Sequence, residues 1–327
     1  MKGTSVMYGY IKLFAGRGCP EVAQSISRYL NIPLSGRDIT EFPNENLWVR
    51  LHNSVRGQDV YVIQTTSSPV HRNLMELLIM LQTMRLDSAG RVTAVVPYLC
   101  YTRSDKKDKP RVPITARLVA DMIEIAGADR YMTLDMHAGQ IQGFFSIPGD
   151  VLTAFHILSE YMATLLPTMK DPVVLTVDLG FAKKGRNFAA ELGLPIAFIE
   201  KRRSTTKGKA EALTLIGDVK DRDVIVVDDE VDTGGSICQA ANLAKEYGAN
   251  DVCMAFVHPV FSGPIIDRLT RAPISRLVTT ASIPIPPKQL AKIKEICEID
   301  ILDVAPLLGE VIRRAHEGRS VGEMFDE

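Results

Sequence analysis

Short apolar runs rich in β-branched residues alternate along the chain with longer segments of helix-like composition. Four such pairs stand out: 60–64 with 73–86, 92–98 with 115–128, 173–178 with 182–193, and 224–229 with 237–249. The short runs lack polar alternation, which is typical of strands buried on both faces of a parallel sheet. Strands that alternate with helices predict an α/β fold, in which a mainly parallel sheet is flanked by helices.

An internal repeat indicates two similar domains. Residues 115–137 align with residues 236–258 without a gap; in each copy a Gly-Ala pair closes the helix and a His ends the following strand. Glycine suits the left-handed position after a helix. The loops before the helices differ, since the second copy has the tight DDEVDTGG and the first the longer, charged PYLCYTRSDKKDKPRVPI. Chance similarity of two helix–strand units is the alternative, but we expect duplicated domains of residues 1–153 and 154–327.

Composition and charge narrow the class of protein. The chain has 327 residues, 46% hydrophobic and 24% charged, with a net charge of -1. This balance gives no general electrostatic footprint for nucleic acid or a membrane surface. No apolar stretch reaches the ~18 residues of a membrane span, and the N-terminus does not resemble a signal peptide. Five scattered cysteines without a CxxC pair disfavour structural zinc and disulfides, so we expect a reducing, cytoplasmic setting.

The stretch VIVVDDEVDTGGSI, Val224 to Ile237, combines a turn that is suited to binding an anion with carboxylates that would repel one. A glycine-rich turn before a helix can direct backbone amides at a phosphate. These amides belong to Thr233, Gly234, Gly235 and Ser236. Three carboxylates, Asp228, Asp229 and Asp232, precede the turn and would repel phosphate unless they bind sugar hydroxyls, or Mg²⁺ through water. The pattern therefore predicts a sugar phosphate ligand. The alternative is an acidic loop that closes a strand; a P-loop is not supported, because no GxxxxGK[ST] occurs.

Polar residues also follow two other predicted strands. His137 comes after a run in which Met132, Leu134 and Met136 alternate as in a half-buried strand. A lone His is more often a satisfied structural residue than a ligand. Asp178 follows the strand at 173–178, where an Asp often only caps the next helix.

Two basic segments are candidates for contacting phosphate groups. Lys201 and Arg203 follow a strand-like stretch within the segment 198–212, whose cationic and polar remainder suggests a lid over polyphosphate. Arg103 belongs to the basic loop at 101–111. The alternative for both segments is an ordinary basic loop that is solvated and binds no ligand.

The motif VVDDEVDTGGSI resembles the phosphoribosyl-pyrophosphate (PRPP) motif of type I phosphoribosyltransferase folds, and the whole chain resembles the ribose-phosphate pyrophosphokinase (PRPP synthetase) family. Matching segments run nearly end to end, among them RVTAVVPYLCYTRSDKKDKPRVPITARLVADM, DMHAGQIQGFF, IEKRR and VHPVFSGP. The resemblance implies two type I phosphoribosyltransferase-like domains. It also implies transfer of the β,γ-diphosphoryl group of ATP to O1 of ribose 5-phosphate, which gives PRPP and AMP with Mg²⁺.

The resemblance further implies roles for individual residues. Lys201 and Arg203 would be catalytic, because a loose phosphoryl-transfer transition state needs positive charge. ATP would bind Phe42, Asn44, Glu45, Asn46, Arg103, Ser104, Asp105 and His137. Ribose 5-phosphate would bind Arg203, Asp228, Asp229, Asp232, Thr233, Gly234, Gly235 and Ser236. His137 and Asp178 would help hold the Mg²⁺ complex of ATP, and a regulatory phosphate would bind Ser54, Arg56 and Ser282. The implied assembly is a homo-oligomer built from dimers, a hexamer.

Several positions depart from the family pattern. The adenine loop, usually Phe-Ser-Asp-Gly-Glu, reads FPNEN, so Asn44 and Asn46 replace acidic residues. Ser104 replaces Gln, Phe181 replaces Gly, and Ser236 replaces Thr. Besides an active synthetase, two other functions are compatible with the sequence. One is a regulatory paralogue that binds the sugar phosphate and assembles with an active synthetase. The other is a phosphoribosyltransferase that consumes PRPP with a base, although it leaves the duplicated domain unexplained.

Overall fold

The computed structural model describes residues 8–202 and 212–324, apart from the side chains of 201, 202, 212 and 323. It divides into two units. The first holds the described residues up to Thr153, together with Ser282–Pro284 and the segment from Asp303; the second holds Ala154–Ala281 and Ile285–Leu302. We expected residues 154–327 to lie together, whereas the segment from Asp303 packs with the first unit.

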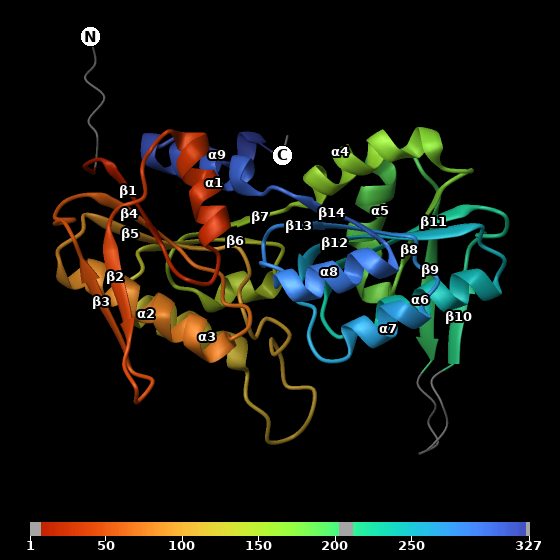
Figure 1. Ribbon diagram of the computed structural model, residues 1–327, viewed down its shortest axis with the longest axis horizontal. Coiled ribbons are helices and arrows are strands. Elements are labelled where there is room, and N and C mark those ends of the chain that lie inside the picture. The colour runs from red at the N-terminus through yellow and green to blue at the C-terminus, as the bar shows by residue number, and fades with distance from the viewer. Residues whose placement is uncertain (1–7, 203–211, 325–327) are drawn as a thin grey trace, which may run out of the picture. The chain divides into compact units, whose positions relative to one another are not determined.

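The first unit is built on a parallel sheet of strand order β1-β4-β5-β6-β7 (Figure 1). Its strands are β1 (Ile11–Ala15), β4 (Asp59–Ile63), β5 (Arg91–Val96), β6 (Arg130–Leu134) and β7 (Gly149–Leu152). Helices α1 (Pro20–Leu30) and α9 (Ala305–Glu317) lie on one face, and α2 (Val70–Leu86) and α3 (Thr115–Ile125) on the other. A hairpin of β2 (Arg37–Glu41) and β3 (Leu47–Leu51) packs on α2, and the 3-10 helix η1 (Gly139–Phe144) follows β6.

A buried polar network explains why the C-terminal helix α9 belongs to the first unit. Asp59 of β4 is fully buried and is held by Arg91 through two hydrogen bonds of 2.7 and 2.6 Å. His316 of α9 places Nδ1 2.7 Å from the same carboxylate, and the Tyr61 hydroxyl donates to the carbonyl of Ile312 at 3.3 Å. A buried carboxylate needs such partners, so these contacts fix α9 against β4.

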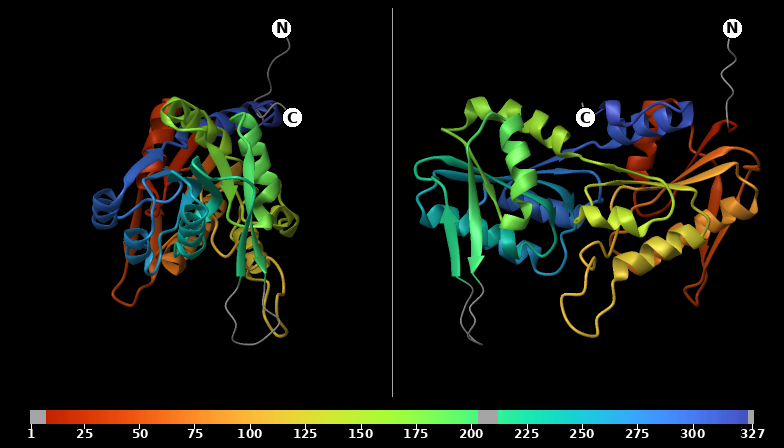
Figure 2. Two further views of the ribbon diagram at one scale, coloured as in Figure 1. Left: turned by 90° about the vertical axis from the view of Figure 1, so that its right-hand side faces the viewer. Right: turned by 180° about the vertical axis from the view of Figure 1, so that it is seen from behind.

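The second unit is built on a larger sheet of strand order β10-β9-β8-β11-β12-β13-β14, in which only the β9–β10 pair is antiparallel. Its strands are β8 (Val173–Thr176), β9 (Ile196–Arg202), β10 (Ala212–Ile216), β11 (Asp223–Val231), β12 (Asp251–Pro259), β13 (Arg276–Thr280) and β14 (Glu298–Leu302). Figure 2 shows this sheet between two helical layers. The helices are α4 (Phe155–Leu165) and α5 (Ala182–Glu191) on one face, and α6 (Gly235–Glu246), α7 (Ile265–Arg271) and α8 (Pro287–Ile296) on the other. This unit also has the short 3-10 helices η2 (Leu166–Thr168) and η3 (Leu179–Phe181), whereas η4 (Gly322–Met324) belongs to the first unit.

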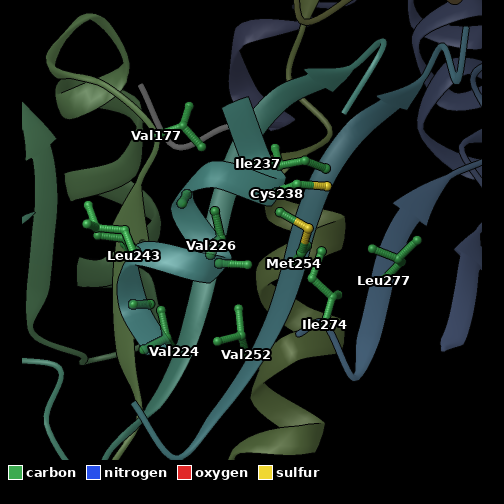
Figure 3. Packing of buried hydrophobic residues seen from close by; sticks show 14 of the residues in the cluster. Val177, Val224, Val226, Ile237, Cys238, Leu243, Val252, Met254, Ile274 and Leu277 are labelled. Atoms are coloured by element: carbon green, nitrogen blue, oxygen red, sulfur yellow. The ribbon is translucent and has the colours of Figure 1, made fainter. Parts of the chain in front are cut away.

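Helix α6 is anchored by apolar side chains from its first turn onward. Ile237 and Leu243 of α6 pack over Val226 of β11 and Met254 of β12 (Figure 3). All four side chains are buried, each with less than a tenth of its surface exposed. This packing fixes the start of α6 at the carboxyl end of β11.

The predicted α/β class and parallel sheets are confirmed, and the internal repeat is visible in the elements. β5, α3 and β6 correspond to β11, α6 and β12, and the two strands pair in parallel in both copies. The glycines after the two helices, Gly127 and Gly248, have φ of 111° and 88°. Within residues 8–202 and 212–324, no helix combines the length and apolarity that a membrane crossing requires.

The interpretation of the strand before His137 as half-buried was wrong. Residues 131–134 of β6 are all buried. Because β6 lies between β5 and β7 with helices packed against the sheet, both of its faces are covered, and Thr133 is as inaccessible as its apolar neighbours.

Candidate functional site

The glycine-rich turn of the second unit is short and sterically constrained. Only residues 232–234 connect β11 with α6. Gly234 has φ of 79°, and a Cβ there would lie 2.5 Å from Cδ1 of Ile265, so the position requires glycine. Gly234 is also the N-cap of α6 and has no side chain to cap it. The turn therefore directs the amino end of a twelve-residue helix, a favourable site for an anion, outward from β11.

Three carboxylates gather beside this turn. Strand β11 pairs with β8 only as far as Val227, which leaves Asp228 and Asp229 just beyond that pairing, near Asp178 at the end of β8. The Asp229 N–H donates to Asp228 Oδ1 at 2.9 Å. Burial raises the pKa of Asp228 well above its usual range, and the charges of Asp229 and Asp178 raise it further. The ionised form of such a carboxylate is stabilised by hydrogen bonds from sugar hydroxyls or by a nearby cation.

These carboxylates fit a Mg²⁺ ion that is shared with a substrate. Mg²⁺ prefers oxygen ligands and is commonly held by one or two carboxylates together with phosphate oxygens and water. The described part of the chain contains no group of three or more His, Cys, Asp or Glu side chains that could hold a metal ion. His137 and Asp178, the two predicted metal ligands, belong to different units.

Asp178 has a structural contact as well. Its Oδ1 accepts a hydrogen bond of 3.0 Å from the Phe181 N–H and so caps η3. The Phe181 side chain is 7% exposed and belongs to the core cluster of α4 and α5, with its ring centroid 5.7 Å from that of Phe155. The bulky residue that departs from the family pattern thus fills the hydrophobic core.

The segment after β12, which includes Ser262 of the matching stretch VHPVFSGP and Arg268 beyond it, packs against the turn. Arg268 of α7 donates from Nη1 to the carbonyl and hydroxyl oxygens of Thr233, at 2.9 and 2.7 Å. The Ser262 hydroxyl donates to Oδ1 of Asp232, and the Ser262 N–H donates to the Asp232 carbonyl at 3.1 Å. Arg268 lies 35 positions after Thr233 and outside the stretches that the sequence singled out, so no local pattern could have identified its contact with the turn.

In the first unit, the predicted adenine loop is the tip of the β2–β3 hairpin. The Phe42 N–H donates to the Asn46 carbonyl at 2.9 Å, and the Glu45 N–H donates to the Phe42 carbonyl at 2.8 Å. The Asn46 N–H donates to the Asn44 side-chain oxygen at 3.2 Å, so that amide oxygen already has one partner within the loop. The Phe42 ring is 46% exposed and is available for stacking.

The end of β2 next to this loop is tied to α2. Glu41 accepts from Arg72 at 2.6 Å and lies 3.6 Å from Arg17. Arg17 in turn donates from its backbone N–H and Nε to the buried carboxylate of Glu76, both at 2.6 Å. These ion pairs connect the hairpin, beside the predicted adenine loop, to α2 and to the segment after β1.

The long loop before α3 holds three more predicted ATP residues. Arg103 is exposed, and Ser104 Oγ accepts from the Thr115 N–H at the start of α3, at 3.2 Å. Asp105 is 7% exposed and accepts a hydrogen bond from the side-chain amide of Gln140. Gln140 belongs to η1, which follows the exposed His137. The structure thus links the Arg103–Asp105 loop to the segment after His137.

The remaining predicted residues differ in environment. Ser54 and Arg56 are exposed and are linked by a hydrogen bond of 3.2 Å from the Arg56 N–H to Ser54 Oγ. Ser282 is fully buried, and its carbonyl accepts from the Thr65 hydroxyl at 3.1 Å. Lys201 is a β9 residue whose backbone pairs with Leu213; its side chain, and Arg203 as a whole, lie outside the described residues.

Comparisons with known proteins match nearly the whole chain. Residues 11–127 match the family described as the N-terminal domain of ribose phosphate pyrophosphokinase, and residues 200–326 match the phosphoribosyl synthetase-associated domain. A ribose-phosphate pyrophosphokinase of Clostridium tetani is 43% identical over 317 residues, 97% of each chain. One of Aquifex aeolicus is 41% identical over 315 residues, 96% of this chain and 99% of that protein. The crystal structure of phosphoribosylpyrophosphate synthetase from Mycobacterium smegmatis is similar with a TM-score of 0.87 and 38% identity, covering 94% of this chain and 99% of that one.

Proposed function

The chain belongs to the ribose-phosphate pyrophosphokinase family, and we propose how its residues divide the family's reaction between them. The protein is an enzyme that transfers the β,γ-diphosphoryl group of ATP to O1 of ribose 5-phosphate, which gives PRPP and AMP. The observation that carries the assignment of the sugar site is the turn from Asp228 to Ser236, where a constrained helix start adjoins partly buried carboxylates.

The second unit binds ribose 5-phosphate. The 5-phosphate lies in the turn at Asp232–Ser236, where backbone amides and the hydroxyls of Thr233 and Ser236 can donate to it. Asp228 and Asp229 accept hydrogen bonds from the ribose hydroxyls. This arrangement holds the phosphate at one end of the sugar and leaves the hydroxyl at C1 to attack.

The first unit supplies contacts to ATP. Phe42 stacks on the adenine, while the amides of Asn44 and Asn46 bind its edge. Arg103 contacts the phosphates, and His137 helps to hold the metal complex of ATP. Ser104 and Asp105 fix the loop that carries Arg103, through Thr115 and Gln140.

Charge stabilisation is the main catalytic task. A loose phosphoryl-transfer transition state spreads negative charge over peripheral oxygens, so cations and position matter more than a covalent partner. We assign this task to Lys201 and Arg203. Mg²⁺ bound with ATP would neutralise phosphate charge, and Asp178 and His137 are the residues that would help hold it.

The structure weakens one motive for a regulatory paralogue. Phe181 packs with Phe155 in the core. Its presence in place of the usual glycine therefore gives no reason to expect a blocked sugar pocket. Of the remaining substitutions, Asn44, Asn46 and Ser104 lie on the nucleotide side and keep groups that can accept hydrogen bonds, and Ser236 in the turn keeps the hydroxyl of the usual Thr.

The test is to incubate the purified protein with Mg²⁺, ATP and ribose 5-phosphate and to follow the products by phosphorus NMR. We expect AMP and PRPP in equal amounts. Binding of ribose 5-phosphate without AMP would favour the regulatory paralogue. Ribosyl transfer from supplied PRPP to a nucleobase, without ATP, would favour a phosphoribosyltransferase.

The proposal also covers the oligomeric state, a regulatory phosphate site and the cellular compartment. The family resemblance leads us to expect a homo-oligomer built from dimers, a hexamer, which light scattering after size-exclusion chromatography tests. Exposed Ser54 and Arg56 are accessible to a regulatory phosphate, whereas Ser282 would have to contribute from a buried position. All five cysteines are buried free thiols, which suits a reducing cytoplasm.

A further inference from the structure

Arg268 is not among the residues that the sequence predicts for the site, yet it contacts the centre of the sugar-phosphate turn. Its Nη1 is 2.7 Å from the Thr233 hydroxyl oxygen and 2.9 Å from the Thr233 carbonyl oxygen. A guanidinium can only donate hydrogen bonds. The Thr233 hydroxyl oxygen is therefore the acceptor, and its own proton must point away from Arg268.

Helix α7 holds Arg268 rigidly at this position. Ile265 and Leu269, on either side of Arg268 along the helix, are 0% and 1% exposed. Ile265 fills the space beside Gly234, and Arg268 Nη1 lies 3.2 Å from the point where a Cβ on Gly235 would be. Arg268 and Ile265 thus pack against three successive residues of the turn, from Thr233 to Gly235.

The charge of Arg268 reaches the start of α6. Burial raises the pKa of the Cys238 thiol to about 11, and the positive charge of Arg268 opposes that rise. Cys238 is in the first turn of α6, so the guanidinium adds positive potential at the helix end where an anion would bind. This potential offsets the nearby carboxylates Asp228, Asp229 and Asp232.

We propose that Arg268 is a positioning residue for the 5-phosphate: it orients the Thr233 hydroxyl so that its proton is donated to the phosphate, and its charge strengthens the anion site from beneath the turn. The proposal rests on the proposed function only in taking the ligand of this turn to be a sugar phosphate. It explains how a phosphate is bound beside three carboxylates.

The test compares Arg268→Met, which removes charge and donors, with Arg268→Lys, which keeps the charge but not the planar fork. For Arg268→Met we expect the KM for ribose 5-phosphate to rise about 10- to 100-fold, as for loss of a charge-assisted hydrogen bond, while the KM for ATP changes less than about twofold. Arg268→Lys should fall between wild type and Arg268→Met. Arg271→Met is the matched control, because Arg271 is an exposed residue of the same helix.

A double-mutant cycle with Thr233→Val isolates the coupling between the two residues. If Arg268 acts through the Thr233 hydroxyl, its substitution should have a much smaller effect once that hydroxyl is absent. Equal rises in both KM values, together with a lower Tm, would mean that Arg268 only supports the fold and would overturn the proposal. An unchanged KM for ribose 5-phosphate would overturn it as well.

The wild-type assay separates this proposal from the proposed function. If wild-type protein makes PRPP, the variants test Arg268 alone. If it makes none but binds ribose 5-phosphate in calorimetry, the synthetase activity fails, and the same variants test Arg268 by the dissociation constant. If wild-type protein binds no ribose 5-phosphate, the turn has a different ligand and the role of Arg268 is refuted.

Discussion

The two copies of the strand–loop–helix repeat share one framework but connect the strand to the helix by loops of very different length. In the second copy, β11 passes to α6 through only three residues, 232–234. In the first copy, β5 passes to α3 through the 18 residues 97–114. A three-residue turn can offer little besides backbone amides, whereas a long loop can extend side chains such as Arg103. We therefore propose that the short loop of the second copy binds phosphate mainly through its main chain. The long loop of the first copy would bind phosphate through side chains.

The helix starts show the same contrast. At the start of α3, the Thr115 N–H donates to Ser104 of the preceding loop, so the chain satisfies this donor itself. At the start of α6, the N-cap is Gly234, which has no side chain to accept from the helix. The second copy thus begins its helix at a glycine, where the absence of a side chain lets a phosphate approach the backbone closely.

The histidines that end the two copies also differ. His258 lies within the longer strand β12, pairs in register with Glu230 and is 2% exposed. Its counterpart His137 comes three residues after β6 ends and is exposed. Equivalent sequence positions therefore have different environments, and only His137 is accessible to ATP.

The largest effect should come from a side chain at Gly234. In Gly234→Ala, the Cβ would lie 2.5 Å from Cδ1 of the buried Ile265 and φ of 79° would be strained, so either the Ile265 side chain or the turn must shift. We expect kcat/KM for ribose 5-phosphate to fall by about 100-fold or more, the scale of losing a key anion-binding donor. Steady-state kinetics measure this loss.

Gly193→Ala is the matched control for the Gly234 substitution. Gly193 has a similar φ of 66°, but a Cβ there would meet no described atom within 4 Å. It should lower stability by about 1–2 kcal/mol through backbone strain and leave kcat/KM unchanged. Equal activity losses in both variants would show that general strain, and not the turn, is responsible.

A smaller effect is expected from the long loop of the first copy. Arg103→Ala should raise the KM for ATP by about 10- to 100-fold, the scale of a lost charge-assisted hydrogen bond, with little change for ribose 5-phosphate. Arg111→Ala, at an exposed position of the same loop, should leave both constants near wild type. A selective rise in the KM for ribose 5-phosphate would contradict the division between the two copies.

The carboxylates of the second copy should lower its stability. The folded-state pKa of Asp228 lies above its unfolded value, so the folded protein holds the proton more tightly, and stability falls as pH rises between the two values. Asp228→Asn removes this penalty. With a chelator present, we expect its Tm to exceed that of wild type by about 2 °C at about pH 8, with the gain fading towards about pH 4.

By the registers of β5 with β6 and of β11 with β12, the equivalent position in the first copy is Tyr98, which has no carboxylate, so this stability cost belongs to the second copy alone. Asp267→Asn, at an exposed position of α7, is the control and should leave the Tm unchanged. A lower Tm for Asp228→Asn at about pH 8 would mean that the carboxylate stabilises the unit, which is the opposite of what its raised pKa requires.

The smallest effect concerns the helix start of the first copy. Ser104→Ala removes the acceptor for the Thr115 N–H, and we expect a loss of about 1 kcal/mol, or roughly 2 °C in Tm. Ser320→Ala, an exposed serine of the same unit, should change neither Tm nor kinetics. An unchanged Tm with a raised KM for ATP would assign the Ser104 hydroxyl to the nucleotide instead of the helix.

The sequence predicted the elements of the fold because their signals are local. Strands such as 224–229 and helices such as 237–249 follow from apolar runs and periodicity, and the repeat follows from spacing. Exposure was less predictable: whether residue 133 faces solvent depends on which strands and helices flank β6. The return of α9 to the first unit depends on Asp59, Arg91 and His316, which meet only in the folded chain.

The same distinction between local and long-range signals applies to the candidate site. The glycines and carboxylates from Asp228 to Ser236 are contiguous, so their chemistry could be inferred from one stretch of sequence. Arg268 and the core position of Phe181 could not, since both depend on packing between separate elements. The nucleotide residues were placed by family resemblance, and their contacts with ATP remain predictions.

The central claim is that the turn of the second copy binds the 5-phosphate through main-chain amides. A crystal structure with ribose 5-phosphate and a non-hydrolysable ATP analogue tests it most directly. We predict phosphate oxygens about 2.7–3.2 Å from backbone nitrogens in the 233–236 turn and from the Thr233 hydroxyl. A phosphate bound elsewhere, with the sugar's other end at the turn or the turn empty of ligand, would contradict the claim.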